Sequence, residues 1–467
     1  MTARGSLAAE VSERIAGGMG LACLYARRDG GGHALEAIMA GDGIERITLP
    51  VDGGSFESIS PAVPCASIYE REVFEEFGLR PEGHPDMRPL RSRSGWGPLE
   101  GASAIPGNGI SGDGVFEIPV GPIHAGVIGP GHFRFSVAGE PVLAMRAYLG
   151  YSRRGVEKAM EGPAGADRAF LAERASGDNS VAHALAYLQT VEQGSEIPLR
   201  ARYIRTIYAE LERACCHLGT ISGIATDAAL AVPAARGAAL RETVLRLNER
   251  ISGSRMLRGA LAVGGVSRDL SAESMWDIEN TVMKLEFDVL DLFKVIAKSP
   301  SFMDRAESTG RLSCEDAEAL RAVGPVARAS GSGYDVRKRR PYAAYGDIAL
   351  NVPSCRGGDV YARLSIRKEE AMESLSAVTQ CLNQMREGPV RARVETEDGF
   401  HVGVVESPRG EALHCAHISG GVVTRYKIRD ASFPNWPALE RAVMGNIVPD
   451  FPLVNKSFDL SYSGNDL

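Results

Sequence analysis

The sequence predicts an α+β protein, in which a small N-terminal α/β sandwich domain precedes a large helix-bundle domain with peripheral antiparallel sheets. Long segments with apolar residues every three or four positions dominate the middle of the chain, and alternating segments lie toward both ends. The length of 467 residues suggests two or three domains. The expected divisions are a domain at 1–80, a Gly-, Pro- and Arg-rich linker or arm at 81–114, and a large domain at 115–467.

Composition limits the classes of function. Hydrophobic residues make up 44% of the chain and charged residues 24%, which is an ordinary globular balance. The net charge of -7 and the isoelectric point near 5.8 argue against nucleic acid as a partner. No apolar run approaches the roughly 20 residues that span a bilayer, and the first residues lack the apolar region of a secretory signal. We expect a cytoplasmic protein that can dock on a membrane-embedded partner.

The eight cysteines are scattered, and no two of them form a C-x-x-C motif. Cys215 and Cys216 are adjacent within a helical pattern, so both thiols cannot face one ligand. This distribution predicts reduced, mostly buried thiols rather than disulfides or a cysteine-bound cluster.

In the first domain, alternation predicts strands at 33–41 and 43–51, and an acidic amphipathic pattern predicts a short helix at 67–79. The charged linker that follows is either a solvated tether or an ordered arm that lies on a neighbour. In the large domain, alternation predicts two strands at 132–139 and 141–149, joined by a turn at Gly139–Glu140.

Two charged segments of the large domain leave alternatives open. Residues 152–162 are expected to form a helix with a solvated charged face. Residues 324–347 combine many cations with aromatic residues, which predicts either a surface for an anionic partner or an interior network of ion pairs. The residues concerned are Arg328, Asp335, Arg337, Lys338, Arg339, Arg340, Tyr342 and Tyr345.

Helical periodicity marks four further segments, 201–219, 238–251, 272–298 and 366–385. After residue 390 the chain returns to alternating strands, then to a short helix and an apolar end that is expected to lie inside the fold.

The central stretch, residues 170–192, joins a polar turn to a buried helix. The turn at 174–179 is either an N-terminal helix cap or part of a pocket. We expect a site where this turn meets the loops at 121–132 and 407–414 and the C-terminus. His124 and His132 in the first loop could bind a metal or donate hydrogen bonds to a ligand, and two histidines alone make a weak metal site.

Seven blocks, in this order, resemble the large subunit of group 4 membrane-bound nickel–iron hydrogenases of the formate-hydrogenlyase and hydrogenase-4 type, and its relative, the quinone-site subunit of respiratory complex I. The first domain resembles the small hydrophilic complex I subunit, fused ahead of it, through residues 69–90. The resemblance covers essentially the whole chain. The seven blocks are 121–140, 148–162, 172–192, 209–219, 257–269, 324–337 and 406–414.

The resemblance also exposes a departure. In hydrogenases of this type, two cysteines in the central turn and two near the C-terminus hold nickel and iron. The matching positions here are non-ligating: Ser176, Asn179, Ser461 and Gly464. Nickel and low-spin iron require soft, anionic sulfur, so we predict that this chain binds no nickel–iron centre or other cofactor and does not activate hydrogen.

Other residues of the family's pocket persist. The resemblance makes Glu157, Arg174, His183 and Arg409 the catalytic candidates, with Glu157 matching a glutamate linked to proton transfer. Buried charges without a metal need partners, so either the pocket contains water or a carboxylate such as Asp178 or Asp459 pairs with Arg174 or Arg409. Alternatively, these residues are ion pairs that only hold the fold.

The comparison with complex I gives a second candidate pocket. His124 and His132 loosely match the histidines of the quinone-site subunit and are candidates for binding an acceptor or a quinone. The position of that subunit's quinone-binding tyrosine is Gly177 here, so a hydroxyl donor is lost.

The resemblance implies a subunit of a membrane-bound oxidoreductase complex, peripheral on the inner face of the cell membrane. Its expected partners are a small subunit that carries an iron–sulfur cluster, antiporter-like membrane subunits and a membrane anchor, with quinone and NAD binding as functions of such complexes. The expected role is to couple redox or conformational change at the vacated site to ion movement. The alternatives are reduction of a quinone or another small acceptor, and a pure assembly scaffold, so whether the chain is catalytic stays open.

Overall fold

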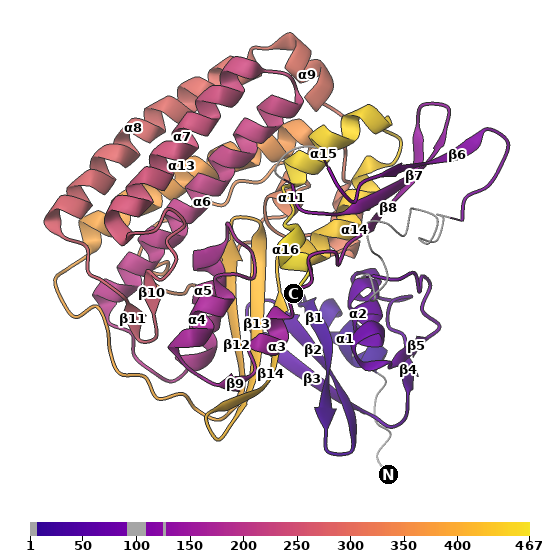
Figure 1. Ribbon diagram of the computed structural model, residues 1–467, viewed down its shortest axis with the longest axis horizontal. Coiled ribbons are helices and arrows are strands. Elements are labelled where there is room, and N and C mark those ends of the chain that lie inside the picture. Colours follow the sequence, from indigo (N-terminus) through magenta and orange to yellow (C-terminus); the bar gives the residue numbers. More distant parts are fainter. Residues whose placement is uncertain (1–6, 91–108, 125–127) are drawn as a thin grey trace.

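The computed structural model describes residues 7–90, 109–124 and 128–467, and it confirms the predicted α+β class (Figure 1). Most of the predicted linker or arm, residues 91–108, lies outside the described residues, as do residues 125–127 of the loop that holds the two candidate histidines. Within the described residues, the sheets are small and mostly antiparallel, and long helices form the largest layer.

The N-terminal region is a three-stranded antiparallel meander with helices packed on it. The strands predicted at 33–41 and 43–51 and the helix predicted at 67–79 are confirmed. Leu21, Leu24 and Ile38 belong to a buried hydrophobic core that also includes Leu7 of α1 and Ile68 of α2. Its elements are α1 (Leu7–Ala16), β1 (Gly20–Asp29), β2 (Gly32–Ala40), β3 (Ile44–Val51), β4 (Ser55–Glu57), α2 (Ser67–Phe77) and β5 (Arg80–Glu82).

A second antiparallel sheet follows, made of β6 (Val115–Val120), β7 (His132–Ala138) and β8 (Val142–Tyr148). The predicted turn between the last two strands is confirmed. Phe133 and Phe135 point from β7 onto Phe451, with ring centroids 4.8 and 5.0 Å apart. This sheet is therefore fastened to the C-terminal part of the chain.

The helical layer is built around α6, whose residues are buried along most of its length. The four predicted helices are all confirmed: α7 and α13 pack beside α6, and α8 packs against α7 and α13 (Figure 1). The long helices are α6 (Leu199–Asp227), α7 (Ala231–Ser252), α8 (Ala272–Ala297) and α13 (Val360–Gln384). The short elements around them are β10 (Leu261–Ala262), β11 (Gly265–Val266), α9 (Pro300–Ala306), α10 (Cys314–Ala319), α11 (Gly324–Ala329) and α12 (Val336–Arg339).

The sheet that positions the site consists of β12 (Gly399–Ser407), β13 (Gly410–Ser419), β14 (Val422–Arg429) and the short β9 (Gly162–Pro163). Helix α5 (Ser180–Val191) covers one face, while Val404, Leu413 and Cys415 on the other face join the core of the N-terminal region. The chain ends in α14 (Ser432–Val443), α15 (Phe451–Phe458) and α16 (Tyr462–Asn465). Leu467 is buried, so the predicted inward-facing end is confirmed.

Residues 152–162 differ from the prediction. The helix there, α3 (Val156–Ala159), is a single turn, and Glu157 is buried rather than solvated. Glu157 faces β14, where Lys427 supplies a positive charge 2.9 Å away. A helix of one turn is too short to show a helical repeat of apolar residues. The charged residues of this segment were therefore expected to face solvent.

Segment 324–347 contains the interior network of ion pairs that was one of the two alternatives. Arg328, Asp335 and Arg337 are fully buried and paired, whereas Lys338 and Arg339 remain exposed. All eight cysteines are free thiols and most are buried, as predicted.

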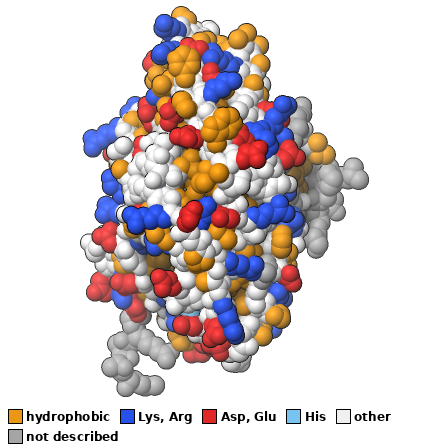
Figure 2. Space-filling view, turned by 90° about the vertical axis from the view of Figure 1, so that its left-hand side faces the viewer, with side chains coloured by type: hydrophobic (Ala, Val, Ile, Leu, Met, Phe, Trp, Pro, Cys, Tyr) orange, Lys and Arg blue, Asp and Glu red, His pale blue; other side chains and the backbone are white. Residues whose placement is uncertain are grey.

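The surface is mixed in character. Figure 2 views the side on which α8 lies in Figure 1 and shows apolar side chains interspersed with charges of both signs. Trp276, Met283 and Phe287 of α8 are among the exposed apolar residues. In the described part of the chain, no helix has both the length and the apolar character needed to cross a bilayer.

Candidate functional site

The central turn is held in place by its neighbours. It connects α4 (Ala166–Ala172) to α5, and its residues Ser176 and Asn179 are fully buried. The Glu212 carboxylate of α6 accepts hydrogen bonds from the first backbone N–H groups of α5, at 2.6 Å from Val181 and 3.0 Å from Ala182. The carboxyl oxygens of Glu212 satisfy amides that a helix leaves unpaired, although burial raises the pKa of Glu212 to about 8. The polar turn is thus both a helix start and a wall of the site.

The C-terminal segment packs directly onto this turn. The hydroxyl oxygens of Ser176 and Ser461 lie 2.8 Å apart, and the Gly464 amide donates to Ser461 Oγ over 3.0 Å. The Asp466 carboxylate accepts from the amides of Gly150 and Ser152, at 2.7 and 2.9 Å, which fastens the chain end to the loop after β8. The turn 174–179, the loop 407–414 and the C-terminal segment meet here through Ser176, Arg409 and Ser461. The fourth expected loop, 121–132, also reaches this segment, because Gly129 and Gly131 lie against Tyr462 of α16.

Arg409 occupies the turn between β12 and β13 and reaches into this meeting point. Its guanidinium donates to both carboxylate oxygens of Asp178, at 2.9 and 2.6 Å, and lies 3.3 Å from the Asp459 carboxylate. The predicted pairing of Arg409 with Asp178 and Asp459 is confirmed. Partial burial opposes ionisation of Asp178, but the Arg409 charge and its hydrogen bonds outweigh this effect and lower the pKa of Asp178 to about 2.

The backbone at Arg409 is placed by a close approach to α11. A Cβ atom on Gly324 would lie 2.1 Å from the Arg409 carbonyl oxygen, and one on Gly410 would lie 2.5 Å from the Gly324 nitrogen. Both glycines have positive φ angles, of 67° and 124°. Only glycine fits both the available space and the positive φ angle, so this close approach fixes the backbone position of Arg409.

Arg174 does not reach the same cluster. Its side chain is half exposed, lies 3.8 Å from Glu173 and donates to the Phe170 carbonyl group. Arg154, which the sequence placed on a solvated helix face, instead donates to the carbonyls of Arg174 and Ala175 in the turn and of Ser463 near the C-terminus, at 2.6, 2.8 and 2.9 Å. Arg154 is thus the arginine that ties the turn to the chain end.

His183 lies on α5 beneath the turn and joins a line of buried polar groups. Its Nε2 atom lies 3.0 Å from Asp430 Oδ2, and its Nδ1 atom lies 2.9 Å from His414 Nε2. His414 Nδ1 in turn lies 2.7 Å from the hydroxyl of Tyr426. The sequence reasoning singled out His183 alone, although the alternation of β13 and β14 could have placed His414 and Tyr426 on one face of the sheet.

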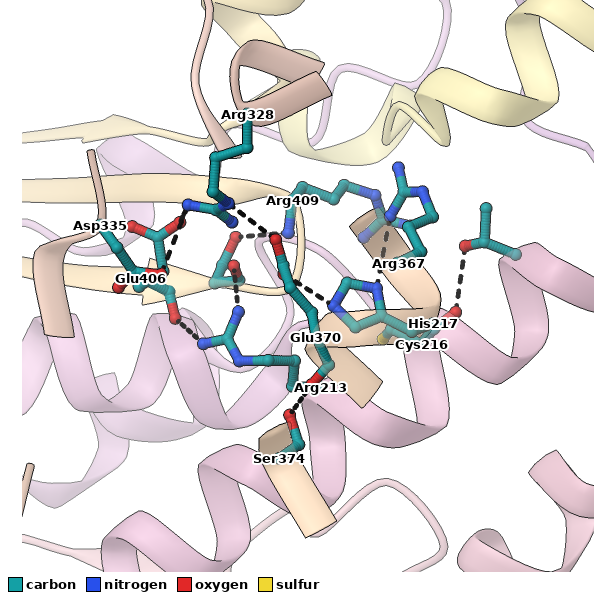
Figure 3. Close-up of polar contacts among 12 residues, drawn as sticks. Arg213, Cys216, His217, Arg328, Asp335, Arg367, Glu370, Ser374, Glu406 and Arg409 are labelled. Carbon is teal, nitrogen blue, oxygen red and sulfur yellow. Dashed lines mark hydrogen bonds and ion pairs between the residues drawn. The ribbon is translucent and has the colours of Figure 1, made fainter. Parts of the chain in front are cut away.

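Behind Arg409 lies a set of buried charges that we call the arginine network. Figure 3 shows Glu370 between Arg328 and His217, at 2.7 and 3.0 Å. Burial lowers the pKa of His217 to about 4, which keeps this imidazole neutral beside Arg367. Arg213 donates to the Glu406 and Ser407 carbonyls at the end of β12, which precedes Arg409. The network comprises Arg213, Arg328, Arg337, Arg367, Glu210, His217, Asp335, Glu370 and Glu406.

Glu157 belongs to a different cluster, on the side of β14 that faces the N-terminal region. Lys427 bridges it to Glu72 of α2, at 2.9 and 2.7 Å, and Arg425 lies 3.5 Å away. Burial raises the pKa of Glu157 despite these cations, while the two glutamates raise the pKa of Lys427 above its usual value. The structure therefore places Glu157 between the two parts of the chain.

The two loop histidines bond to their own loop. His124 Nε2 lies 2.8 Å from the Gly131 carbonyl oxygen, and His132 Nδ1 lies 3.2 Å from that of Gly121. His132 Nε2 is buried and has no hydrogen-bond partner among the described residues. Burial lowers the pKa of His132, so its neutral ring could accept or donate one further hydrogen bond.

Comparisons with known proteins agree with this architecture. The family model of the 49 Kd subunit of respiratory-chain NADH dehydrogenase matches residues 228–398, and that of the 30 Kd subunit matches residues 32–107. Formate hydrogenlyase subunit 5 of Escherichia coli is 31% identical over 446 residues, which cover 90% of this chain and 78% of the relative. The chain belongs to this family of hydrogenase and complex I subunits.

Two further relatives show both branches of the family. Hydrogenase-4 component G of Escherichia coli is 30% identical, covering 91% of this chain and 78% of the relative. NADH-quinone oxidoreductase subunit 4 of Thermus thermophilus is 32% identical, covering 74% of this chain and 92% of the relative. The chain is thus a complex I 30 and 49 kDa-like subunit of the hydrogenase-4, formate hydrogenlyase or NADH-quinone oxidoreductase type.

The four positions that the resemblance matches to the hydrogenase cysteines do not offer the ligands of a nickel–iron centre. Two of the four ligand-equivalent positions, Ser176 and Ser461, hydrogen-bond to each other, and Asn179 offers a neutral amide. At the fourth, Gly464, even a Cβ atom would lie 2.6 Å from the Asp430 carboxyl carbon. These groups lack the soft anionic sulfur that such metals require. Within the described ranges, no group of three or more His, Cys, Asp or Glu side chains is arranged to hold a metal ion.

Proposed function

We propose that this chain is a metal-free, hydrogenase-like subunit of a complex I-related oxidoreductase complex, and that it couples redox or conformational change at the site around Arg409 to ion movement through partner subunits. One observation carries the proposal. The four ligand-equivalent positions are closed by neutral groups, while Arg409 keeps its bidentate contact with Asp178 and its ion pair with Asp459.

The expected partners follow from the family. The printed names of the relatives describe subunits or components of larger enzymes. By analogy, this chain would face a small subunit that carries an iron–sulfur cluster, and would sit on antiporter-like membrane subunits and a membrane anchor at the inner face of the membrane. Electrons would arrive from the small subunit, since this chain supplies no cysteine cluster of its own. An electron donor such as NADH would bind to another subunit of that complex and not to this chain.

Four residues have proposed roles. Arg409 holds the site's negative charges in place, and His183 connects the site to the sheet below it. Glu157, buried between the N-terminal region and β14, is placed to exchange a proton when the two parts of the chain shift. Arg174 is half exposed at the turn, where it would meet a partner subunit rather than a ligand inside the site.

The test is turnover of the purified complex with Arg409→Gln and Glu157→Gln variants. The coupling role predicts assembled complexes in which electron transfer or ion transport falls at least about tenfold, because each substitution removes a charge from a buried cluster. Arg246→Gln on the exposed side of α7 is the matched control. Normal transport and electron transfer in both assembled variants would favour the scaffold role instead.

Metal analysis tests the other half of the proposal. Nickel and iron should be far below one equivalent in the purified chain. Stoichiometric nickel and iron, or uptake of dihydrogen by the pure protein, would contradict it.

The second candidate is reduction of a quinone or another small acceptor. It is favoured by His132, whose buried Nε2 atom has no partner among the described residues and lies on a ring 6.1 Å from that of Tyr148. Quinone analogues titrated into the complex should then inhibit turnover, and His132→Leu should weaken that inhibition. Inhibition that His132→Leu leaves unchanged would place any acceptor elsewhere.

A further inference from the structure

Four buried side chains form one continuous line of hydrogen bonds beneath the site. The line runs from Asp430, at the end of β14, through His183 of α5 and His414 of β13 to Tyr426 of β14, with contacts of 3.0, 2.9 and 2.7 Å. All four side chains are fully buried. Each contact joins atoms that can exchange a proton, and both nitrogens of both imidazoles are used.

The chemistry of the two ends fixes the direction of every hydrogen bond. Burial opposes ionisation of Asp430, but the hydrogen bond from His183 and nearby positive charge outweigh burial and lower its pKa. Burial holds the pKa of His414 well below its usual value and that of Tyr426 well above. Asp430 is therefore a carboxylate that only accepts, His414 is neutral, and Tyr426 keeps its proton.

When each imidazole carries a single proton, one arrangement satisfies all three contacts. His183 donates from Nε2 to Asp430, which leaves its Nδ1 atom as an acceptor. His414 must then donate from Nε2 to His183, and Tyr426 must donate its hydroxyl proton to His414 Nδ1. Every donor in the line points toward Asp430, and hydrogen bonds in such a chain strengthen one another.

We infer that Asp430, His183, His414 and Tyr426 form a reversible proton relay between the sheet and the floor of the candidate site. A proton that arrives at the Tyr426 oxygen releases the phenol proton to His414 Nδ1. The Nε2 proton of His414 passes to His183 Nδ1, and that of His183 passes to Asp430 Oδ2. Each group gains one proton and loses one except Asp430, which becomes a neutral carboxylic acid, and no electrons move. The reverse sequence resets the line.

One end of the relay lies at the floor of the candidate site, and the other lies among ionisable groups of the sheet and of α5. Asp430 sits against Gly464, one of the ligand-equivalent positions, and its charge acts on Arg409. Thr190 of α5 lies near Tyr426, and its hydroxyl donates to the Tyr187 carbonyl over 2.7 Å. The ionisable groups that face Tyr426 are Tyr187 of α5, Cys415 of β13 and Glu157 of α3. Protonation of the Asp430 carboxylate removes a negative charge beside Arg409. This consequence rests on the proposed coupling function, whereas the direction of the hydrogen bonds does not.

The direction can be tested in the isolated full-length chain. Asp430 Oδ1 accepts from the Ser432 amide over 2.7 Å, so in Asp430→Asn the amide oxygen is retained there and the NH₂ group faces His183. A donor at that end reverses the line. Nitrogen NMR of the ¹⁵N-histidine-labelled chain should show both rings protonated on Nε2 in the natural sequence and on Nδ1 in Asp430→Asn. Unchanged tautomers in a folded Asp430→Asn variant, or Nδ1 protonation in the natural sequence, would overturn the relay.

Proton delivery is tested in the assembled complex with Tyr426→Phe. This substitution removes the terminal hydroxyl and keeps the ring, so turnover should fall by about tenfold or more with an altered solvent deuterium isotope effect. Tyr208→Phe is the control, because Tyr208 is also buried but lies on α6, outside the relay. Equal turnover and isotope effects in the two variants would refute proton delivery. A complex that turns over nothing even with the natural sequence, but shows the expected tautomer reversal, would refute the proposed coupling and leave the relay standing.

Discussion

The four ligand-equivalent positions and the arginine network behind them lie close together but are built in opposite ways. The ligand-equivalent positions hold small neutral groups, two of which, the Ser176 and Ser461 hydroxyls, satisfy each other. The arginine network holds full charges out of contact with water, and Arg328 alone contacts Glu370, Glu406 and Asp335. A residue at the ligand-equivalent positions can be replaced without leaving a charge unpaired, whereas replacing a charged residue of the arginine network leaves its partner unpaired.

The difference explains why the cations of this region do not depend on ligands at these four positions. Hydroxyls, an amide and a glycine carry no negative charge, so the buried cations need other partners. Arg409 has them in Asp178 and Asp459. The charged framework is thus independent of any metal, and its arginines and carboxylates hold β12, α6, α13 and the C-terminal segment together.

The largest effect should come from Arg328→Met. The substitution leaves Glu370, Glu406 and Asp335 as buried carboxylates without their shared cation, and breaking such a group costs about 3–5 kcal/mol. Urea unfolding monitored by circular dichroism measures the loss. Arg339→Met is the control, because Arg339 is largely exposed in its pair with Asp42 and should change stability by no more than about 0.5 kcal/mol. Equal losses in the two variants would show that the network is not what stabilises the fold.

Acid should weaken the same network in a defined range. Burial opposes ionisation of Glu210, but Arg213 and Arg337 outweigh burial and lower its pKa from 4.5 to about 2. The unfolded chain then binds a proton first as the pH falls, so this contribution is complete above about pH 4.5 and disappears toward pH 2. The shift corresponds to about 3 kcal/mol of unfolding free energy.

Free energies of unfolding measured at a series of pH values test this contribution. Glu210→Gln should flatten the curve below pH 4.5 by roughly that amount, about 3 kcal/mol, whatever its stability at neutral pH. A variant curve parallel to that of the natural sequence would show that other carboxylates set the acid limit.

The sequence was sufficient for those parts of the fold whose pattern repeats several times. The strands at 132–139 and 141–149 alternate over their whole length, and α8 keeps its apolar period for 26 residues. It was insufficient at 152–162, where α3 has one turn and burial of Glu157 depends on Lys427, about 270 residues away in the chain. Pairing at that distance leaves no local pattern to detect.

The same limit applied to the site. The sequence offered Asp178 and Asp459 as partners for Arg174 or Arg409, because an uncompensated buried charge is costly wherever it lies, and both carboxylates contact Arg409. It did not predict that Arg174 points outward or that Arg154 takes its place. Nor did it find Asp430, since a carboxylate at the end of a strand acquires a role only when α5 brings His183 within hydrogen-bonding distance.

A double-mutant cycle between Arg409 and Asp178 tests whether the ion pair in the candidate site contributes to stability as the buried ion pairs of the arginine network do. The two side chains share two hydrogen bonds of 2.9 and 2.6 Å, and Asp178 is partly exposed to water. Water can therefore rescue the aspartate when Arg409 is replaced, so we expect a coupling energy of about 2 kcal/mol from Arg409→Gln and Asp178→Asn. Urea unfolding of the two single variants and the double variant measures this coupling energy. A value near zero would show that the pair contributes no more to stability than an ordinary surface ion pair.

The smallest effect should come from the ligand-equivalent positions, where only packing is at stake. Gly464→Ala forces a methyl group to 2.6 Å from the Asp430 carboxyl carbon, and overpacking of this kind costs roughly 1–2 kcal/mol. Gly388→Ala is the matched control, because a Cβ atom there meets nothing within 4 Å and should leave stability unchanged within about 0.5 kcal/mol. If Gly464→Ala costs no more than its control, Asp430 can move aside without loss. A cysteine at position 464 would then be sterically permitted, and the neighbours of Gly464 would not by themselves exclude a larger side chain there.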